Sequence, residues 1–510
     1  MHRSPTPDAE AALAAELSVV RPELSAPFAA GLPGARAAVL SRLWRALAHE
    51  PMPWIARREP GRDGLTLHLA DGRRLSGPHA DPYATAAYVT EVRLDGTAYD
   101  RPARLMTALA VPNGPDFAAE LDHSTASLAL SRAGQPGAQP EPVTSREWEQ
   151  RVVDGHPYHP NCRSRPGFSV AEQIAYGPEH RPVVGLGLAS MPSEECLVAG
   201  DWPKWLRDGD RVLIPVHPWQ AEHVLGAGGV LGPADQEGVP AHPLMSLRTL
   251  ALPDGPHVKT ALSARLTSSV RDISVQSVAS SGTVSAFAES MAARTDGLLH
   301  VTRTLGAVTA NTPDLAAVLR EPPEAYVSSE AGERVVPVAA LPATGLPRSP
   351  SWMAEFTRLA LTVGLRLLDL GVALEAHGQN LLVVLSSTDA PLRLVYRDLA
   401  DIRVSPARLG RHGIGVPELS GRIVTDDEVT LRRKLFGSLV AGALAATAGS
   451  APTLREALAT AVRDLPRTED LAALLDEPLP TKALTLMRLS PRTPGDRWTH
   501  LPNPLNSPAP

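Results

Sequence analysis

The sequence predicts an α+β protein made of two or three structural units. Its 510 residues exceed what a single hydrophobic core usually organises. Alanine and leucine recur at helical spacing over residues 9–20 and 35–49, whereas residues 150–345 hold short β-like runs separated by Pro and Gly. Helical periodicity returns after residue 350. Helices and strands are therefore expected in separate regions rather than in regular alternation.

Composition excludes several classes of protein. Apolar residues make up 43% of the chain and charged residues 20%, as in ordinary soluble globular proteins. Two cysteines exclude a disulfide scaffold, and a net charge of −6 gives no strong field toward nucleic acid or an anionic membrane. The N-terminus lacks an apolar run behind its first positive charge, and the apolar stretch 435–448 is typical of a buried helix. We therefore expect a cytoplasmic protein without nucleic-acid or membrane partners.

Two loops rich in Pro and Gly divide the predicted units, at 133–142 and 341–350. We therefore predict an N-terminal helical region with a β-hairpin (1–145), a β-rich region (146–345) and a C-terminal region (346–510).

Local patterns support these units. Leucines alternate with polar residues over 65–69 and meet Asp71-Gly72, which predicts the hairpin. The periodic stretch 352–370 ends at Gly371, a natural helix stop. Further β-like or buried-strand runs are expected at 212–216, 274–278, 298–304, 381–385 and 392–396.

Five polar segments stand beside apolar runs or turns. The first, at 156–169, holds His156 and His159, each followed by Pro. Proline keeps the preceding residue extended, so structural or anion-binding histidines are favoured over a zinc helix. The nearby Arg163 and Arg165 suit anion binding.

The second segment, His217 to Gln220, follows a predicted strand. A buried His and Trp pair that closes a sheet explains it as well as catalysis does. The third segment is Ser246-Leu247-Arg248-Thr249.

The fourth segment runs from Lys259 to Arg271, and Lys259 is one of only four lysines in the chain. If the segment is one extended strand, cations and hydroxyls share a face, because side chains alternate along a strand. Such a face binds polyanions, since Arg grips carboxylate or phosphate and Lys supplies a point charge. The alternative is an ordinary solvated face. The residues on this face are Lys259, Ser263, Arg265, Thr267, Ser269 and Arg271.

The fifth segment, 375–380, reads EAHGQN and lies between a helix and an apolar strand, with Asp398 after the next strand. Carboxylates and an amide at strand ends are typical of sites where Mg²⁺ holds nucleotide phosphates. The alternative is that these residues are ordinary loop caps. P-loop, dinucleotide and hydrolase motifs are absent from the sequence.

Together, the segments resemble the NRPS-independent siderophore (NIS) synthetases, the aerobactin-synthetase-like IucA/IucC family. The resemblance covers about residues 150–505 with the expected order and spacing. The matching pieces are HPYHPNCRSRPGFS (156–169), HPWQ (217–220), SLRT (246–249), KTALSARLTSSVRDIS (259–274), EAHGQN (375–380), RD (397–398) and the segment from Lys482 to Leu505.

The resemblance implies a cupped-hand architecture with an N-terminal helical thumb, β-rich fingers and a C-terminal α/β palm. It also implies an enzyme that uses ATP and Mg²⁺ to adenylate a carboxylate, commonly of citrate, and passes the acyl group to an amine or a hydroxyl. A homodimer is a further implication. The chain has no cysteine cluster near its C-terminus, so iron reduction is not implied.

The resemblance also implies roles for individual residues. Arg271 would bridge the carboxylate and the α-phosphate, Thr267 and Ser268 would orient the acid, and His377 would contact both reactants. Ser268 has the wrong strand parity for this role, which requires a bend. The implied nucleotide contacts are Ser246, Arg248, Thr249, Lys259, His159, Arg163 and Gln379, and the implied metal ligands are Glu375, Asn380 and Asp398. Arg163 stands where the family more often has lysine.

Two rival functions remain open from sequence. A small-molecule phosphotransferase would explain His377, Asn380 and Asp398 as a kinase-like metal site, although such enzymes generally place an Asp inside the His loop. A non-catalytic relative that binds citrate or a ferric chelate is the second rival.

Overall fold

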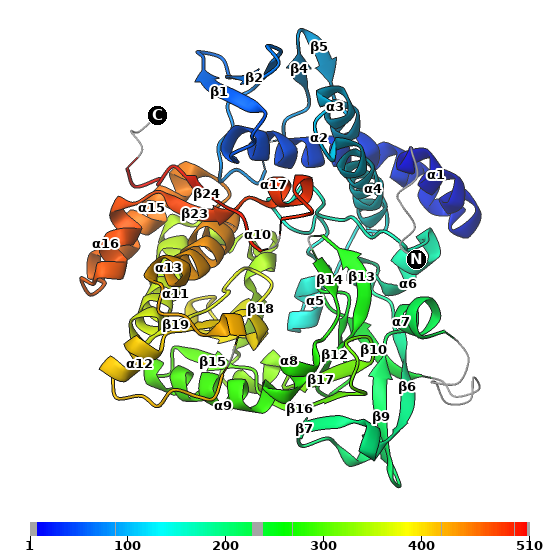
Figure 1. Cartoon of the computed structure of the whole chain (residues 1–510), viewed down its shortest axis with the longest axis vertical. Coiled ribbons are helices and arrows are strands. Elements are labelled where there is room, and N and C mark those ends of the chain that lie inside the picture. The colour runs from blue at the N-terminus through cyan, green and yellow to red at the C-terminus, as the bar shows by residue number, and fades with distance from the viewer. Residues whose placement is uncertain are drawn as a thin grey trace.

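The computed structural model describes residues 8–86, 88–226, 238–267, 269–419, 421–493 and 495–506. In Figure 1 the N-terminal helices lie at the top, the largest sheet lies at the lower right, and the C-terminal helices lie on the left. The final strand and helix return to the N-terminal helices, so a C-terminal segment packs against the N-terminal region.

Helices and a small sheet form the N-terminal region. The helices are α1 (Ala9–Val20), α2 (Ser25–His49), α3 (Pro102–Leu109) and α4 (Gly114–Ala133). The sheet is β1 (Ile55–Pro60), β2 (Leu65–Leu69), β3 (Arg74–Gly77), β4 (Val92–Leu94) and β5 (Thr97–Tyr99), in that order. The predicted hairpin is confirmed, because β2 and β3 pair antiparallel and Gly72 takes a φ of 91° in the turn. Helices α2 and α4 pack through buried side chains such as Leu43 and Leu121.

A nine-stranded sheet fills the middle of the chain in the order β7-β16-β17-β12-β11-β10-β6-β9-β8. The pairs within it are antiparallel, as the short β-like runs predicted. Its strands are β6 (Val184–Pro192), β7 (Leu197–Gly200), β8 (Arg207–Asp208), β9 (Arg211–Val216), β10 (Val239–Pro243), β11 (Thr249–Ala251), β12 (His257–Thr260), β16 (Thr304–Thr309) and β17 (Ala316–Arg320). Short helices α5 (Ser145–Gln150), α6 (Val170–Tyr176) and α7 (Pro218–Gln220) lie beside it.

Two sequence predictions fail in this region. The run 274–278 is not a strand but helix α8 (Val275–Ala279), because the Ser274 side chain accepts the backbone N–H of Ser277 as an N-cap. The segment from Lys259 to Arg271 is not one strand. It divides into β12, β13 (Leu262–Leu266) and β14 (Ser269–Arg271), and the chain reverses between β13 and β14.

The reversal begins at Thr267, whose φ of 57° lies in the left-handed region that β-branched residues avoid. Leu266 therefore pairs with Ser269, and Leu262 pairs with Arg271. The bend that Ser268 requires is present next to it, but Ser268 itself lies outside the described residues.

The C-terminal region packs a long helix against a mixed sheet of order β15-β21-β20-β18. Helix α11 (Pro350–Leu370) ends at Gly371 with a φ of 106°, as predicted. The strands are β15 (Leu299–Val301), β18 (Arg334–Pro337), β20 (Leu381–Leu385) and β21 (Pro391–Tyr396). The remaining elements are α9 (Ser281–Ala292), α10 (Leu341–Thr344), β19 (Val372–Ala373), β22 (Arg403–Val404), α12 (Pro406–Arg411), α13 (Glu428–Leu435), α14 (Ala445–Ala448), α15 (Ala451–Ala461), α16 (Glu469–Asp476), β23 (Leu479–Lys482), α17 (Leu484–Leu489) and β24 (Trp498–Leu501).

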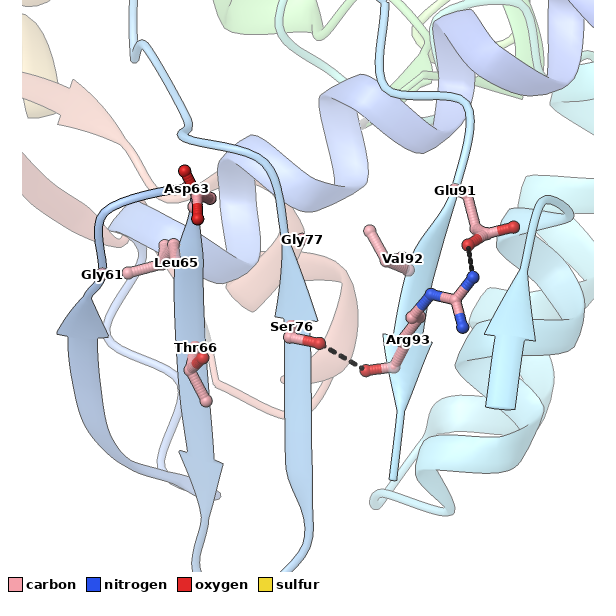
Figure 2. Close-up of a pocket in the computed structure, with 10 residues that line it drawn as sticks. Gly61, Asp63, Leu65, Thr66, Ser76, Gly77, Glu91, Val92 and Arg93 are labelled. Carbon is pink, nitrogen blue, oxygen red and sulfur yellow. Dashed lines mark hydrogen bonds and ion pairs between the residues drawn. The ribbon is translucent and has the colours of Figure 1, made fainter. Parts of the chain in front are cut away.

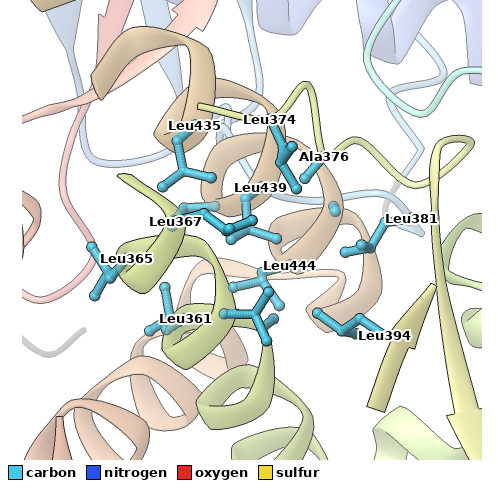
Figure 3. Close-up of a cluster of buried hydrophobic side chains, with 14 of the residues drawn as sticks. Leu361, Leu365, Leu367, Leu374, Ala376, Leu381, Leu394, Leu435, Leu439 and Leu444 are labelled. Atoms are coloured by element: carbon cyan, nitrogen blue, oxygen red, sulfur yellow. The ribbon is translucent and has the colours of Figure 1, made fainter. Parts of the chain in front are cut away.

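Leucines from α11, from α13 and from the segment that follows it form the centre of this core (Figure 3). The apolar stretch expected to be a buried helix is helical and largely buried, and its part Phe436–Leu444 is a π-helix. The same core takes in α9 and the strands β15 and β18, which the predicted boundaries assign to the preceding region.

Membrane-spanning potential is limited in the described residues. No single helix there is both long and apolar enough to cross a bilayer. The pair Glu428–Ala448 and Ala451–Asp464 passes that test of length and composition only when taken together, and it is bent by 118°.

Candidate functional site

An ion pair between a buried lysine and a partly exposed aspartate joins the middle sheet to the C-terminal region. Lys259 lies on β12, between Thr249 of β11 and Val318 of β17. Its Nζ donates to both carboxylate oxygens of Asp398 at 2.8 Å, and the Arg320 guanidinium approaches one of them at 3.1 Å. Two strands of the sheet therefore present cations to a carboxylate that follows β21.

The electrostatics of this group are strongly perturbed. Burial lowers the pKa of Lys259 to about 7, although the charge of Asp398 opposes the shift. Burial would raise the pKa of Asp398, but the charges of Lys259 and Arg320 outweigh it and hold that pKa well below its ordinary value. Asp398 also takes a φ of 70°, a conformation that costs about 1–2 kcal/mol for a residue with a side chain.

A small pocket opens beside this group and brings together five of the predicted site residues. It lies between the turn that precedes β11 and the loops that flank β20 and β21. The predicted residues that line it are Ser246, Thr249, Gln379, Asn380 and Asp398. The residues that complete the lining are Leu244, His257, Thr302, Arg320, Glu321 and Arg397.

The SLRT segment forms a tight turn between β10 and β11. The Ser246 hydroxyl accepts the backbone N–H of Thr249 at 3.2 Å, and Leu247 takes a φ of 63°. Arg248 leaves this turn toward the β13–β14 hairpin, where its guanidinium donates to the carbonyls of Arg271 and Asp272 at 2.6 and 2.7 Å. Arg248 therefore fixes the end of the hairpin that carries Arg271.

The charge of Arg271 acts on His377 although about a hundred residues separate them. Burial lowers the pKa of His377, the charges of Glu375 and Asp398 oppose the shift, and the positive charge of Arg271 adds to it. The only hydrogen bond of the Arg271 side chain to the described residues is a long one, 3.5 Å to the Leu266 carbonyl. Its guanidinium therefore retains donors for a ligand.

The EAHGQN loop alternates between buried and accessible positions. Leu374 and Ala376 are buried in the core in Figure 3, whereas Glu375 and His377 remain partly exposed. Gly378 packs against residue Ala339, and a Cβ at position 378 would lie 3.0 Å from the Ala339 backbone nitrogen. This anchoring presents Glu375 and His377 away from the core.

Glu375 is bound by two lysines that the sequence analysis did not assign to the site. Its Oε1 accepts from Lys434 Nζ at 3.1 Å and from Lys482 Nζ at 3.3 Å. Lys434 also contacts Asp401 at 2.7 Å, and Lys482 contacts Asp496 at 3.1 Å. With Lys259, three of the four lysines of the chain lie on carboxylates at or near the candidate site. Because lysine is rare in this chain, its rarity could have marked Lys434 as a candidate site residue from sequence alone.

The first motif is built into the structure more deeply than expected. His156 Nδ1 accepts the backbone N–H groups of Tyr158 and His159, and His159 Nδ1 accepts that of Asn161, each near 3 Å. Burial lowers the pKa of His159 to about 3, and nearby arginines, Arg271 among them, add to the shift. His159 is therefore neutral, and the charge of Arg271 on the β13–β14 hairpin is close enough to lower its pKa.

Arg163 is directed into the interior, which favours a structural role over the expected nucleotide contact. Its guanidinium is 5% exposed and donates to the carbonyls of Val152 and Val153. It also pairs with Glu179, which Arg165 contacts as well. Because a buried carboxylate requires this positive charge, the arrangement indicates a structural role for Arg163.

The HPWQ segment supports the hairpin rather than the pocket. His217 Nδ1 accepts the backbone N–H of Trp219, and the Trp219 ring stacks on Phe168 at 5.0 Å. Gln220 accepts the backbone N–H of Ser263 at 2.7 Å, which fixes β13. The structural alternative is therefore favoured for this segment.

The donor chemistry of the pocket fits a magnesium ion in part. Asn380 and Asp398 line the same pocket and offer the amide and carboxylate oxygens that Mg²⁺ prefers. Glu375 does not line the pocket, and its carboxylate is held by two ammonium groups. The predicted metal set therefore divides into Asn380 and Asp398, which line the pocket, and Glu375, which does not. Both carboxylates are paired with cations, since Asp398 is bound by Lys259 and Arg320.

A second cavity, of about 390 Å³, lies on the N-terminal sheet and contains none of the predicted site residues. It is lined by the ends of β2, β3 and β4, including Thr66, Ser76 and Arg93 (Figure 2). Ser76 and Arg93 face one another across a hydrogen bond of 3.5 Å.

Comparison with known proteins gives the class of fold. The chain superimposes on the petrobactin biosynthesis protein AsbB from Bacillus anthracis str. Sterne with a TM-score of 0.75 and 17% identity, covering 94% of this chain and 98% of that chain. It superimposes on ATP-bound aerobactin synthetase IucA from Klebsiella pneumoniae with a TM-score of 0.71 and 20% identity, covering 92% and 99%. The cupped-hand α+β architecture of the siderophore synthetases is therefore confirmed as the fold.

Sequence comparison then shows which families two segments of the chain resemble. Residues 144–343 match the model of the IucA/IucC family, and residues 350–496 match a model described as ferric iron reductase FhuF-like transporter. Residues 144–343 are therefore similar to the IucA/IucC family. Both cysteines, Cys162 and Cys196, lie outside residues 350–496, so that segment has no thiolate with which to ligate iron.

Two curated relatives illustrate the level of similarity. The citryl-spermidine/3,4-dihydroxybenzoyl-citryl-spermidine:spermidine ligase of Bacillus anthracis is 26% identical over 311 residues, 49% of this chain and 50% of that protein. The 2-[(L-alanin-3-ylcarbamoyl)methyl]-3-(2-aminoethylcarbamoyl)-2-hydroxypropanoate synthase of Staphylococcus aureus is 25% identical over 335 residues, 53% of each chain. The matched segments span about half the length of these relatives.

Proposed function

We propose that the protein is an ATP-dependent synthetase of siderophore biosynthesis. It adenylates a carboxylate of citrate or a related polycarboxylate and condenses the acyl group with an amine or an alcohol. The products are an amide or ester, AMP and pyrophosphate. The names of the relatives, a citryl-spermidine ligase and a synthase, support a ligase over a phosphotransferase.

One observation carries the proposal most directly. Lys259 of β12 and Arg320 of β17 contact Asp398, and Asp398 lines a pocket together with Arg320, Ser246, Thr249 and Asn380. A triphosphate needs positive charge and hydroxyl donors, whereas its metal ion needs carboxylate and amide oxygens. Both kinds of group are therefore present at one pocket.

The chemistry follows from the charges of the reactants. A carboxylate oxygen attacks the α-phosphorus of ATP, and the bond between that phosphorus and the bridging oxygen of pyrophosphate breaks. Both reactants are anions, so the attack requires cations that cancel their repulsion. We assign this role to Arg271, which retains guanidinium donors and is held by Arg248 through its backbone carbonyl.

In the second half-reaction the nucleophile attacks the acyl carbon, and the bond from that carbon to the AMP oxygen breaks. The attacking amine or hydroxyl must lose a proton. His377 is suited to accept it, because burial lowers the pKa of its imidazole and keeps the ring neutral near pH 7. Thr267 at the hairpin reversal and Ser268 beside it would orient the acid.

Mg²⁺ would supply charge neutralisation on the phosphate oxygens. We place Asn380 and Asp398 as its ligands and Gln379 beside the nucleotide. Glu375 would instead hold Lys434 and Lys482 near His377. Lys259, Ser246, Thr249 and His159 remain proposed nucleotide contacts, whereas Arg248 acts by holding the hairpin.

The setting of the reaction is also part of the proposal. We infer a cytoplasmic enzyme whose partners are a citrate-class acid and an amine or hydroxyl nucleophile, without nucleic acid or membrane. A homodimer is proposed from family resemblance, and light scattering of the purified chain tests it.

The test of the function is acid-dependent consumption of ATP with hydroxylamine as a surrogate nucleophile. A panel of citrate, succinyl and 2-oxoglutarate classes should include at least one acid that gives a hydroxamate together with AMP. ADP as the nucleotide product would support the phosphotransferase instead. Binding of ATP or citrate without turnover would support the non-catalytic relative.

A further inference from the structure

Glu149, near the end of helix α5, is a carboxylate that neither the motifs nor the proposed reaction uses. It is 1% exposed. A buried carboxylate is costly unless it is paired and accepts hydrogen bonds. Here one oxygen accepts a hydrogen bond and the other forms an ion pair, and the two partners are at or next to residues that line the candidate nucleotide pocket.

The first partner belongs to the middle sheet. Glu149 Oε2 accepts the backbone N–H of Met245 at 2.7 Å. Met245 directly precedes Ser246, which lines the pocket, and Leu247 in the same turn adopts a left-handed conformation. The hydrogen bond therefore holds one end of a strained turn.

The second partner belongs to the C-terminal region. Glu149 Oε1 lies 2.7 Å from an Nη atom of Arg397, an ion pair in which both side chains are less than 10% exposed. Arg397 in turn donates through Nε and its other Nη atom to the Gln379 carbonyl, at 3.0 and 2.8 Å. Its backbone N–H donates to the Asn380 carbonyl at 3.0 Å. One arginine thus fixes two consecutive peptide groups beside the pocket and directly precedes Asp398.

Helix α5 is itself firmly held. The Thr144 side chain and Glu147 form a reciprocal capping box, and Glu324 accepts the backbone N–H of Ser145 at 2.8 Å. Trp148 is buried in the C-terminal core. Glu149 is therefore presented from a fixed support rather than from a mobile loop.

We propose that Glu149 is a positioning residue that sets the distance and register between the two walls of the nucleotide pocket. One oxygen fixes the turn that carries Ser246, and the other fixes Arg397 and, through it, Gln379, Asn380 and Asp398. The inference rests on the proposed function only in taking this pocket as the ATP site.

Glu149→Gln tests the proposal. The amide retains an acceptor for Met245 but removes the negative charge from Arg397, which is then buried without its counter-charge. The dissociation constant for ATP, measured by direct titration of the full chain, should rise about tenfold or more, a shift typical of coupled sites. Where the enzyme turns over, KM for ATP should rise and KM for the acid should stay near that of the wild type.

Two further variants separate positioning from general destabilisation. Asp470→Asn removes another buried carboxylate, which pairs with Arg408 and Arg432 outside the pocket. It should lower the thermal midpoint but leave the ATP dissociation constant unchanged. Glu149→Asp keeps the charge but is one methylene shorter, so it cannot reach both partners and should also weaken ATP binding.

Hydrogen exchange supplies a readout that does not depend on activity. In Glu149→Gln, amide exchange should accelerate in peptides covering 244–250 and 377–381 together, whereas Asp470→Asn should accelerate neither. Unchanged ATP affinity in both Glu149 variants would overturn the inference and leave the proposed function standing. ATP binding by the wild type without AMP formation would overturn the function, while the Glu149 comparison would still decide the inference. No binding of ATP by the wild type would overturn both.

Discussion

Lys259 Nζ lies 2.8 Å from both carboxylate oxygens of Asp398, across 139 positions of the sequence. The lysine belongs to the middle sheet and the aspartate to the C-terminal region. Their contact joins the segment that begins at Lys259 to the segment that ends at Asp398, so two motifs that are weak individually meet at one site. It also sets the charge state of the proposed triphosphate contact, because burial lowers the pKa of this lysine to about 7.

The first prediction concerns pH. Below about pH 7 the Lys259 side chain is an ammonium that attracts phosphate, and above it the charge is progressively lost. The ATP dissociation constant of the wild type should therefore rise as pH increases from about 6 to about 9. Lys259→Arg keeps a charged guanidinium across this range, so it should flatten the profile. A direct nucleotide titration that shows the same slope in both proteins would contradict the assignment.

The second prediction concerns Arg271. Its side chain has one long hydrogen bond to the described residues, so Arg271→Ala should leave the thermal midpoint close to that of the wild type. The rate of adenylation should fall by about 10²–10³-fold, the usual effect of removing a donor that stabilises developing charge. Quenched-flow measurement of AMP provides the check. Turnover at the wild-type rate would remove Arg271 from the reaction.

A third prediction concerns the seam between the two ends of the chain. Glu50 at the end of α2 is buried, and its carboxylate accepts the backbone N–H groups of Thr485 and Leu486 at the start of α17. Burial raises its pKa to about 7, although these hydrogen bonds oppose the shift. Between the unfolded value of about 4.5 and this folded value, the folded state holds more protons. The contribution of Glu50 to the free energy of unfolding therefore decreases as pH rises through that window.

Glu50→Gln should remove this loss. Relative to the wild type, the variant should gain about 3 kcal/mol in free energy of unfolding between about pH 4.5 and pH 7, because one pKa unit corresponds to about 1.4 kcal/mol. Urea denaturation of both proteins at several pH values measures the difference. A difference that stays constant with pH would show that Glu50 titrates normally.

The fourth prediction concerns packing in the C-terminal core. A Cβ at Gly364 of α11 would lie 2.9 Å from Leu439 Cδ2, so this glycine permits close helix contact. Gly364→Ala should lower the free energy of unfolding by about 1–3 kcal/mol through overpacking. Gly410→Ala in α12 is the matched control, because nothing lies within 4 Å of its added Cβ. That control should be neutral or stabilising by up to about 1 kcal/mol, and equal effects of the two changes would refute the packing argument.

Local patterns were the most predictable part of the molecule. The end of α11 at Gly371, the buried strand at 381–385 and the hairpin turn at Asp71-Gly72 follow from propensities that act over a few residues. The family resemblance implied nucleotide or metal roles for Ser246, Asn380 and Asp398, and these three residues line one pocket.

Features that depend on pairing over long distances were not predictable. Arg320 reaches Asp398 because β17 pairs with β12 about sixty residues earlier, and no local pattern encodes that register. The chain reversal at Thr267 was not predicted, because polar and apolar residues alternate across it as they would in one continuous strand. Arg163 was assigned to the nucleotide because its interior partner, Glu179, carries no motif.

The most direct test of the central claim is the fate of a carboxylate oxygen. The acid substrate, labelled with ¹⁸O in its carboxylates, is converted with ATP and a nucleophile, and the products are analysed by mass spectrometry. Adenylation leaves one labelled oxygen on AMP, because the acyl carbon–oxygen bond breaks in the second step. AMP that carries one ¹⁸O is the expected result. Label in inorganic phosphate together with ADP, or unlabelled AMP, would contradict the account.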